Sequence, residues 1–145
     1  MKLSPRIAPW IIACAFLLRV DVASAQTSEL LGEWHNIDSS TPGLTKVVIT
    51  ENRSEVAVHA WGKCHPEDCD WGPVFGNVYG KTVRDNLISA AHAISAMLQT
   101  NFSETLLIVH LVGPNRLQVE TMTRFTDGSG RSSYARVDTF SRVQP

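Results

Sequence analysis

The sequence predicts an all-β protein, an antiparallel meander of strands that closes into a small barrel. The segments after residue 30 are short and rich in Val, Ile, Thr and aromatic residues. Gly, Pro, Asn and Asp separate these segments, as expected for turns. We expect the meander to close because closure removes the unpaired edges of its first and last strands.

Length and charge limit the possibilities further. The chain has 145 residues, of which 43% are hydrophobic and 19% charged, and its formal net charge is −1. This is enough for one domain with a hydrophobic core and too little for two ordinary domains. The near-neutral charge balance argues against nucleic acid as a partner, because a nucleic-acid binder normally needs a basic face.

Residues 1–25 have the features of a signal peptide. Lys2 and Arg6 precede an apolar run over 7–18, and Ala-Ser-Ala ends the segment with the small residues of a cleavage site. Twelve apolar residues are too few to span a bilayer, which needs about 20. We therefore expect a secreted or periplasmic protein without stable membrane insertion after cleavage, in which 26–145 form a single domain.

Cleavage changes the charge and the cysteine count. It removes three basic residues and one acidic residue, so the formal net charge becomes −3. It also removes Cys14, which leaves Cys64 and Cys69. In an oxidising compartment these two cysteines predict one disulfide bond. The alternative to cleavage is lipidation at Cys14, because Ile-Ile-Ala-Cys loosely matches a lipoprotein box.

The N-terminal half of the domain alternates clearly. A strand is predicted over 32–37, and Thr-Pro-Gly then turns the chain into a second strand over 45–50. The third strand, 55–61, places Val56, Val58 and Ala60 on one face and His59 and Trp61 on the other. A loop is predicted over 62–80, which is rich in Cys, Pro, Asp and Gly.

The segment 83–102 fits two patterns. Apolar residues follow helical spacing from Val83 to Leu98, yet Ile94 and its neighbours also alternate as in a strand. We predict a loop or a short helix near 83–92, followed by a strand from Ala93.

The C-terminal half returns to strands and hairpin turns. Gly-Pro-Asn separates strands predicted over 105–112 and 116–126, and Asp-Gly-Ser-Gly leads to the last strand, 134–143. Asp127 and Arg131 flank this second turn. The pattern favours a geometric hairpin loop over a cradle of backbone amides for an anion.

Two Trp-Gly pairs bracket the Cys-x4-Cys segment, and this is the most unusual local feature. Its simplest interpretation is a structural corner with both tryptophans packed on the barrel. The functional alternative is an aromatic platform for a sugar or another flat ligand, with acidic side chains as acceptors. A metal site is a further alternative, although the spacing matches no familiar zinc or calcium loop. So is a catalytic dithiol, which usually has Cys-x-x-Cys spacing. The candidate ligand-binding residues are Trp61, His65, Asp68, Asp70 and Trp71.

The domain begins with Gly32-Glu33-Trp34, and this start resembles that of lipocalin and avidin-like barrels. In lipocalins the Trp closes one end of the barrel and packs under an Arg from near the last strand. The resemblance therefore implies a small lipocalin-like barrel, structural roles for Gly32 and Trp34, and Arg142 as a cation–π partner of Trp34.

Nearly all of 30–143 also resembles a group of uncharacterised small exported bacterial proteins. They share a Trp-Gly-x-Cys-x-Pro-x-Asp-Cys-Asp-Trp-Gly block, here 61–72. They also share a Gly-x-Trp-x-Asn start, here 32–36, and a Thr-x-Phe-x-Asp-x-Ser-Gly-Arg-x-x-Tyr block, here 123–134. The resemblance implies kinship and no particular activity.

The sequence favours a binding protein over an enzyme. The five histidines are scattered, and no Ser, Cys or carboxylate pair lies in a recognisable nucleophile context, so we expect no catalytic residue, metal or cofactor. The leading hypothesis is an exported, non-enzymatic binding module for a small ligand or glycan, using the barrel mouth or the Trp61/Trp71 loop. A protein–protein module, such as an enzyme inhibitor, and a purely structural protein are the alternatives.

Overall fold

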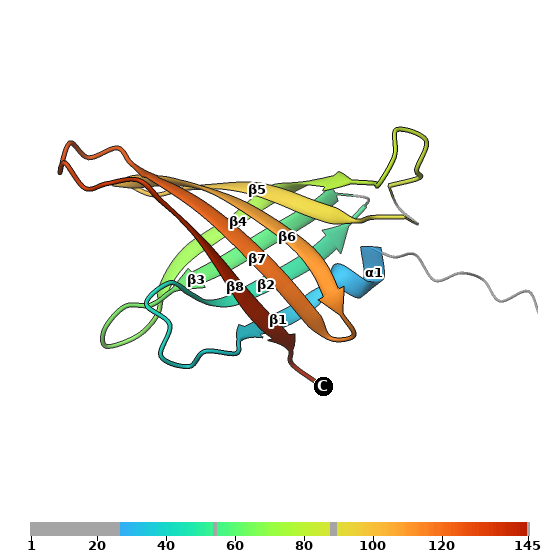
Figure 1. The fold of residues 1–145 in the computed structure, drawn as a ribbon, viewed down its shortest axis with the longest axis horizontal. Helices are drawn as coiled ribbons and strands as arrows, with labels where there is room; N and C mark the ends of the chain where they lie inside the picture. The colour runs from blue at the N-terminus through green and yellow to red at the C-terminus, as the bar shows by residue number, and fades with distance from the viewer. Residues whose placement is uncertain (1–26, 54, 88–89, 145) are drawn as a thin grey trace, which may run out of the picture.

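The computed structural model describes residues 27–53, 55–87 and 90–144. Each strand pairs antiparallel with its neighbours in chain order, and β1 pairs with β8, so the sheet closes into a barrel (Figure 1). The predicted all-β meander is therefore confirmed. The elements are α1 (Thr27–Leu30), β1 (Gly32–Asn36), β2 (Leu44–Asn52), β3 (Glu55–Gly62), β4 (Cys69–Tyr79), β5 (Ala93–Gln99), β6 (Ser103–Gly113), β7 (Arg116–Phe125) and β8 (Tyr134–Arg142).

The core consists of the side chains that alternate inward along each strand. In β3, Val56, Val58 and Ala60 are buried, whereas His59 and Trp61 are partly exposed, as the alternation predicted. Burial of such apolar side chains is the main favourable contribution to the stability of the barrel. The largest fully buried side chains are Trp34, Phe140, Leu30, Ile49, Ile94, Leu98, Leu107, Leu117, Val47, Val58, Val109 and Val119.

The helix α1 lies at one end of the barrel (Figure 1), where Trp34 and Arg142 both donate hydrogen bonds to its backbone. Trp34 is 0% exposed, and its Nε1 donates a hydrogen bond to the Leu30 carbonyl at 3.0 Å. The guanidinium carbon of Arg142 lies 4.2 Å from the centroid of the Trp34 ring, and Arg142 also donates to the Leu31 carbonyl. Gly32 is required here because its φ is +125° and an added Cβ would lie 2.6 Å from Arg142 Nη1. The expected cation–π contact is thus present.

The sequence-based loop over 62–80 is wrong for most of its length, because Cys69–Tyr79 form β4. The Gly and Pro residues of this segment are typical of turns, and so the sequence favoured a loop over a strand. Pro73 lies where the register between β3 and β4 shifts, a place where a strand tolerates proline. Gly76 lets β5 approach closely, since an added Cβ would lie 2.8 Å from Cγ2 of Ile94.

The described part of 83–92 consists of turns and bends and contains no helix, so the short helix considered for this segment is wrong there. The Asp85 carboxylate accepts hydrogen bonds from the backbone N–H groups of Lys81 and Thr82 and from the Thr82 hydroxyl. Such local bonds compete with helix formation. The strand begins at Ala93, as predicted. Throughout the described ranges, no helix has both the length and the apolar character needed to cross a membrane.

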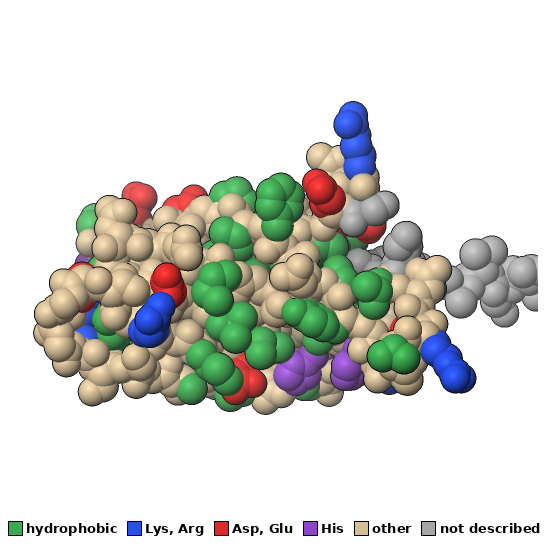
Figure 2. Space-filling model, turned by 90° about the horizontal axis from the view of Figure 1, so that it is seen from above, with side chains coloured by type: hydrophobic (Ala, Val, Ile, Leu, Met, Phe, Trp, Pro, Cys, Tyr) green, Lys and Arg blue, Asp and Glu red, His purple; other side chains and the backbone are tan. Residues whose placement is uncertain are grey.

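One side of the outer wall carries exposed apolar side chains, and Figure 2 shows them gathered over β5 and its neighbours. Phe75 on β4 is 75% exposed. Met97 pairs with Leu106, which in turn pairs with Met122, so these residues form one outward row across β5, β6 and β7.

Candidate functional site

The end of the barrel opposite Trp34 is surrounded by four loops, which connect β1 to β2, β3 to β4, β5 to β6 and β7 to β8 (left side of Figure 1). We call this end the mouth. A cavity of about 580 Å³ lies there. The side chains that line it include Trp71, Phe102, Phe125, Tyr134, Arg131 and Lys63.

The interior of the barrel changes from polar to apolar with distance from the mouth. Thr105 and Thr123 pair across β6 and β7, two residues inside Phe125, and their buried hydroxyl groups hydrogen-bond at 2.9 Å. Four residues further along the same strands, Val109 pairs with Val119, and both are fully buried. The mouth therefore has hydrogen-bonding groups beneath it, and the hydrophobic core begins below them.

An ion pair inside the barrel fixes one wall of the mouth. Arg136 Nε donates to Asp138 Oδ2 at 2.7 Å, and Arg136 Nη2 donates to the Thr41 hydroxyl at 3.1 Å. The hydrogen bond with Asp138 raises the pKa of Arg136, so the guanidinium remains charged. Because Thr41 belongs to the loop between β1 and β2, these bonds attach that loop to β8.

The predicted disulfide is confirmed and lies at the mouth. Cys64 and Cys69 are bonded, with their Cα atoms 5.4 Å apart, and both line the cavity. Trp71 lies two residues after Cys69 and packs against Gly62, where an added Cβ would lie 2.5 Å from Cζ2 of the indole. The absence of a side chain at Gly62 therefore makes room for the ring.

Trp61 lies elsewhere. It precedes the inward-facing Gly62 on β3 and so points to the outer face of the wall. There its ring stacks on His59 with a centroid distance of 3.7 Å, and Lys46 Nζ lies 3.7 Å from the ring centroid. Trp61 pairs with Asp70, so Trp71, the next residue of β4, faces the opposite side of the wall. The structure therefore does not bring Trp61 and Trp71 together into one platform.

The three other predicted site residues are also separated. Asp70 lines the cavity, but its carboxylate accepts hydrogen bonds from His59 Nε2 at 2.5 Å and from the Gly72 N–H at 2.7 Å. The bond from His59 is the main reason that the pKa of Asp70 is lowered. Asp68 lies 3.4 Å from Lys63 Nζ, and His65 is exposed.

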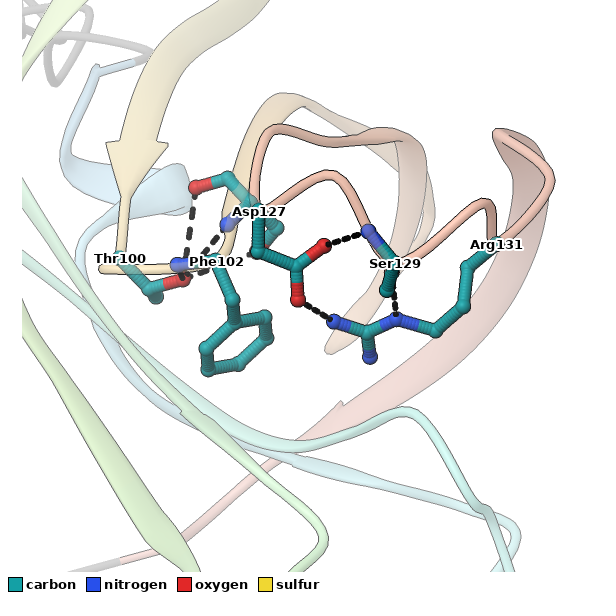
Figure 3. A network of polar contacts seen from close by, with 6 residues as sticks. Thr100, Phe102, Asp127, Ser129 and Arg131 are labelled. Carbon is teal, nitrogen blue, oxygen red and sulfur yellow. Dashed lines mark hydrogen bonds and ion pairs between the residues drawn. The ribbon is translucent and has the colours of Figure 1, made fainter.

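The loop between β7 and β8 contributes a network that sequence reasoning treated as turn geometry (Figure 3). Arg131 Nη2 donates to Asp127 Oδ2 at 2.6 Å, and Arg131 Nε donates to the Ser129 hydroxyl at 2.8 Å. The Arg131 guanidinium carbon lies 3.8 Å from the centroid of Phe125 and 5.4 Å from that of Phe102. Hydrogen bonds from Ser129 and then the contact with Arg131 lower the pKa of Asp127 to about 2.

Sequence reasoning missed Phe102, Phe125 and Tyr134 as residues of the mouth. The sequence could have predicted the inward direction of Phe125, because this residue continues the alternation of Thr121 and Thr123. That they meet Trp71 across the mouth depends on which loops share an end of the barrel.

Within the described ranges, no group of three or more His, Cys, Asp and Glu side chains is placed to hold a metal ion, so the metal alternative with His65, Asp68 and Asp70 is not formed. No family model, curated protein or solved structure matches the chain. The chemistry of the mouth is therefore inferred from its own residues.

Proposed function

We propose that this protein is an exported binding protein that takes one small, ring-bearing ligand, such as a sugar or a flat metabolite, into the mouth and performs no chemistry on it. The observation that carries this proposal is the cavity of about 580 Å³ with aromatic rings on its walls. Ligand sites typically have volumes of about 300–1,000 Å³, mostly apolar walls and a few polar groups that orient the ligand.

The residues of the mouth suit a ring with polar substituents. Trp71, Phe102, Phe125 and Tyr134 contribute aromatic rings from three different hairpins. Gln99 and Asn101 line the same cavity and carry side-chain amides, which can donate and accept hydrogen bonds. A ring can thus bury its faces while its substituents keep polar partners.

The acidic groups near the mouth support binding rather than catalysis. Asp70 is hydrogen-bonded to His59 and Asp127 to Arg131, and both carboxyl groups have a lowered pKa. A general acid or base works best with a pKa near the operating pH. These carboxylates are therefore better suited to holding their loops in place.

Export is part of the proposal. The Cys64–Cys69 disulfide is consistent with an oxidising compartment. The predicted signal peptide, 1–25, lies outside the described residues.

Tryptophan fluorescence tests the site directly. The processed chain would keep three tryptophans: Trp34 in the closed end, Trp61 on the outer wall and Trp71 in the mouth. Titration with a panel of monosaccharides and aromatic metabolites should give a saturable signal that Trp71→Phe abolishes. The matched variant Trp61→Phe should keep the signal. A response that disappears with Trp61 and survives without Trp71 would place binding outside the mouth.

A specific observation also favours the second candidate, a protein–protein module. The outward row with Met97 and Met122, together with Phe75, is apolar and exposed. Exposed apolar patches often mark protein contacts. Sedimentation velocity tests the simplest case, contact between two copies: Phe75→Ser should shift a dimer toward monomer. A wild-type protein that stays monomeric at high concentration would reject that case.

A further inference from the structure

Arg131 is held at the mouth by contacts within its own loop. Its Nε and Nη2 atoms donate to Ser129 and Asp127, and its guanidinium carbon lies 3.8 Å from the centroid of the Phe125 ring. The side chain is nevertheless 46% exposed and lines the cavity. Arg131 is therefore fixed in place but still accessible to a ligand.

The bonds to the loop occupy only one edge of the guanidinium. A guanidinium has five N–H donors in a planar fork, and Nε with one N–H of Nη2 forms its side edge. Among the hydrogen bonds of the described residues, none uses Arg131 Nη1. Figure 3 shows this nitrogen pointing away from both Asp127 and Ser129. The end edge, Nη1 with the second N–H of Nη2, remains available for two parallel bonds to a carboxylate.

The charges around the cavity favour an anion at this edge. Arg131 and Lys63 line the cavity, and Lys63 Nζ lies 3.4 Å from Asp68 Oδ1. The acidic residue among the lining, Asp70, already accepts bonds from His59 and Gly72. Asp127 is not among the described residues that line it. Asp127 and Ser129 contact the side edge of the guanidinium, so Nη1 keeps its donors on a residue that lines the cavity.

Aromatic rings can also bind cations, but Phe125 and Phe102 already contact the Arg131 guanidinium. Arg131 covers Phe125 and lies 5.4 Å from the centroid of Phe102. A cationic ligand would have to displace this guanidinium or lie next to it, and like charges repel. Trp71 lines the same cavity and is not one of the rings that contact Arg131, so its ring is available to the ligand.

We propose that the ligand of the mouth is a ring-bearing carboxylate, whose carboxylate binds the end edge of Arg131 while its ring packs against Trp71. This inference rests on the proposed function and adds the charge of the ligand. The arginine is oriented before the ligand arrives, which lowers the entropic cost of binding. The same chemistry belongs to an acidic sugar and to an aromatic acid.

Two sets of matched probes test the inference by calorimetry on the processed protein. The sugar set is glucuronic acid, glucose and glucosamine, and the aromatic set is benzoate, benzamide and benzylamine. We expect the carboxylate of one set to bind roughly 10- to 100-fold more tightly than its neutral and cationic partners, as for hydrogen bonds to a charged group. The set that shows this preference identifies the kind of ring.

Variants assign the preference to Arg131. Arg131→Gln should remove it, and Arg131→Lys should restore only part of it, because lysine keeps the charge but lacks the planar fork. The matched control is Arg124→Gln, which removes a positive charge from the outer wall, where Arg124 is 69% exposed and paired with Glu104. This control should bind as the wild type does.

The outcomes separate the two proposals. Equal binding of the carboxylate, neutral and cationic members, or a preference that survives in Arg131→Gln, would overturn the charge assignment and leave the proposed function standing. Binding of no member of either set would overturn both.

Discussion

Replacing Gly62 by alanine is expected to destabilise the barrel and to displace Trp71 from the mouth. An added Cβ would lie 2.5 Å from Cζ2 and 2.8 Å from Cε2 of the indole, whereas carbon atoms pack at about 3.5–4.0 Å. The indole is rigid and Gly62 is buried in β3, so either the ring or the strand must move. Overpacking of this kind costs about 1–3 kcal/mol.

Urea denaturation and tryptophan emission measure the two consequences separately. We expect a lower free energy of unfolding and an emission spectrum shifted to longer wavelength, because a displaced Trp71 ring would meet more water. Gly113→Ala is the matched control: no atom lies within 4 Å of its added Cβ, so it should be close to neutral. If Gly62→Ala had the same urea midpoint and the same emission spectrum as the wild type, Trp71 would not pack against Gly62 as described.

Three further predictions concern the disulfide, the β7–β8 loop and the closed end. Replacing Cys64 and Cys69 together by serine should lower the free energy of unfolding by about 2 kcal/mol, the entropic value for so small a ring, in a comparison of denaturation curves; equal curves would contradict it. The Asp127 carboxyl, with its pKa lowered from 3.8 to about 2, should stabilise the loop fully above pH 3.8 and lose this effect only as the pH falls through about 2, so the Arg131 side-chain N–H signal in NMR should be the same at pH 3.5 and pH 6; its loss by pH 3.5 would refute the ion pair. Arg142→Ala removes a cation–π contact and hydrogen bonds to backbone carbonyls, and it should cost about 2 kcal/mol in thermal or chemical unfolding, with wild-type stability as the contrary result.

The features that the sequence predicted depend on residues close together in the chain or on a strict period. Alternation in 55–61 indicated which side chains face inward, and Val56, Val58 and Ala60 are buried. The separation of Cys64 and Cys69 by five positions allowed one short ring, and the bond is present. The contact between Trp34 and Arg142 is the exception, since it was expected from a resemblance at the two ends of the chain and is found in the structure.

The features that the sequence reasoning missed depend on neighbouring strands. Gly76 in β4 favoured a loop locally, yet it is the close approach of Ile94 that requires a glycine there. The platform of Trp61 and Trp71 failed because a neighbour of Trp61, Gly62, faces the interior and receives the ring of Trp71.

The sequence by itself determined the strands that alternate, the turns between most of them and the residues able to form the disulfide, because these properties follow from backbone periodicity and local spacing. Only the tertiary structure decided which loops share the mouth, and so brought Trp71 from one hairpin to the same cavity as Phe102 and Arg131 from two others. The physical reason is that closure of the barrel sets the register of every strand pair at once. No single segment of the chain carries that information.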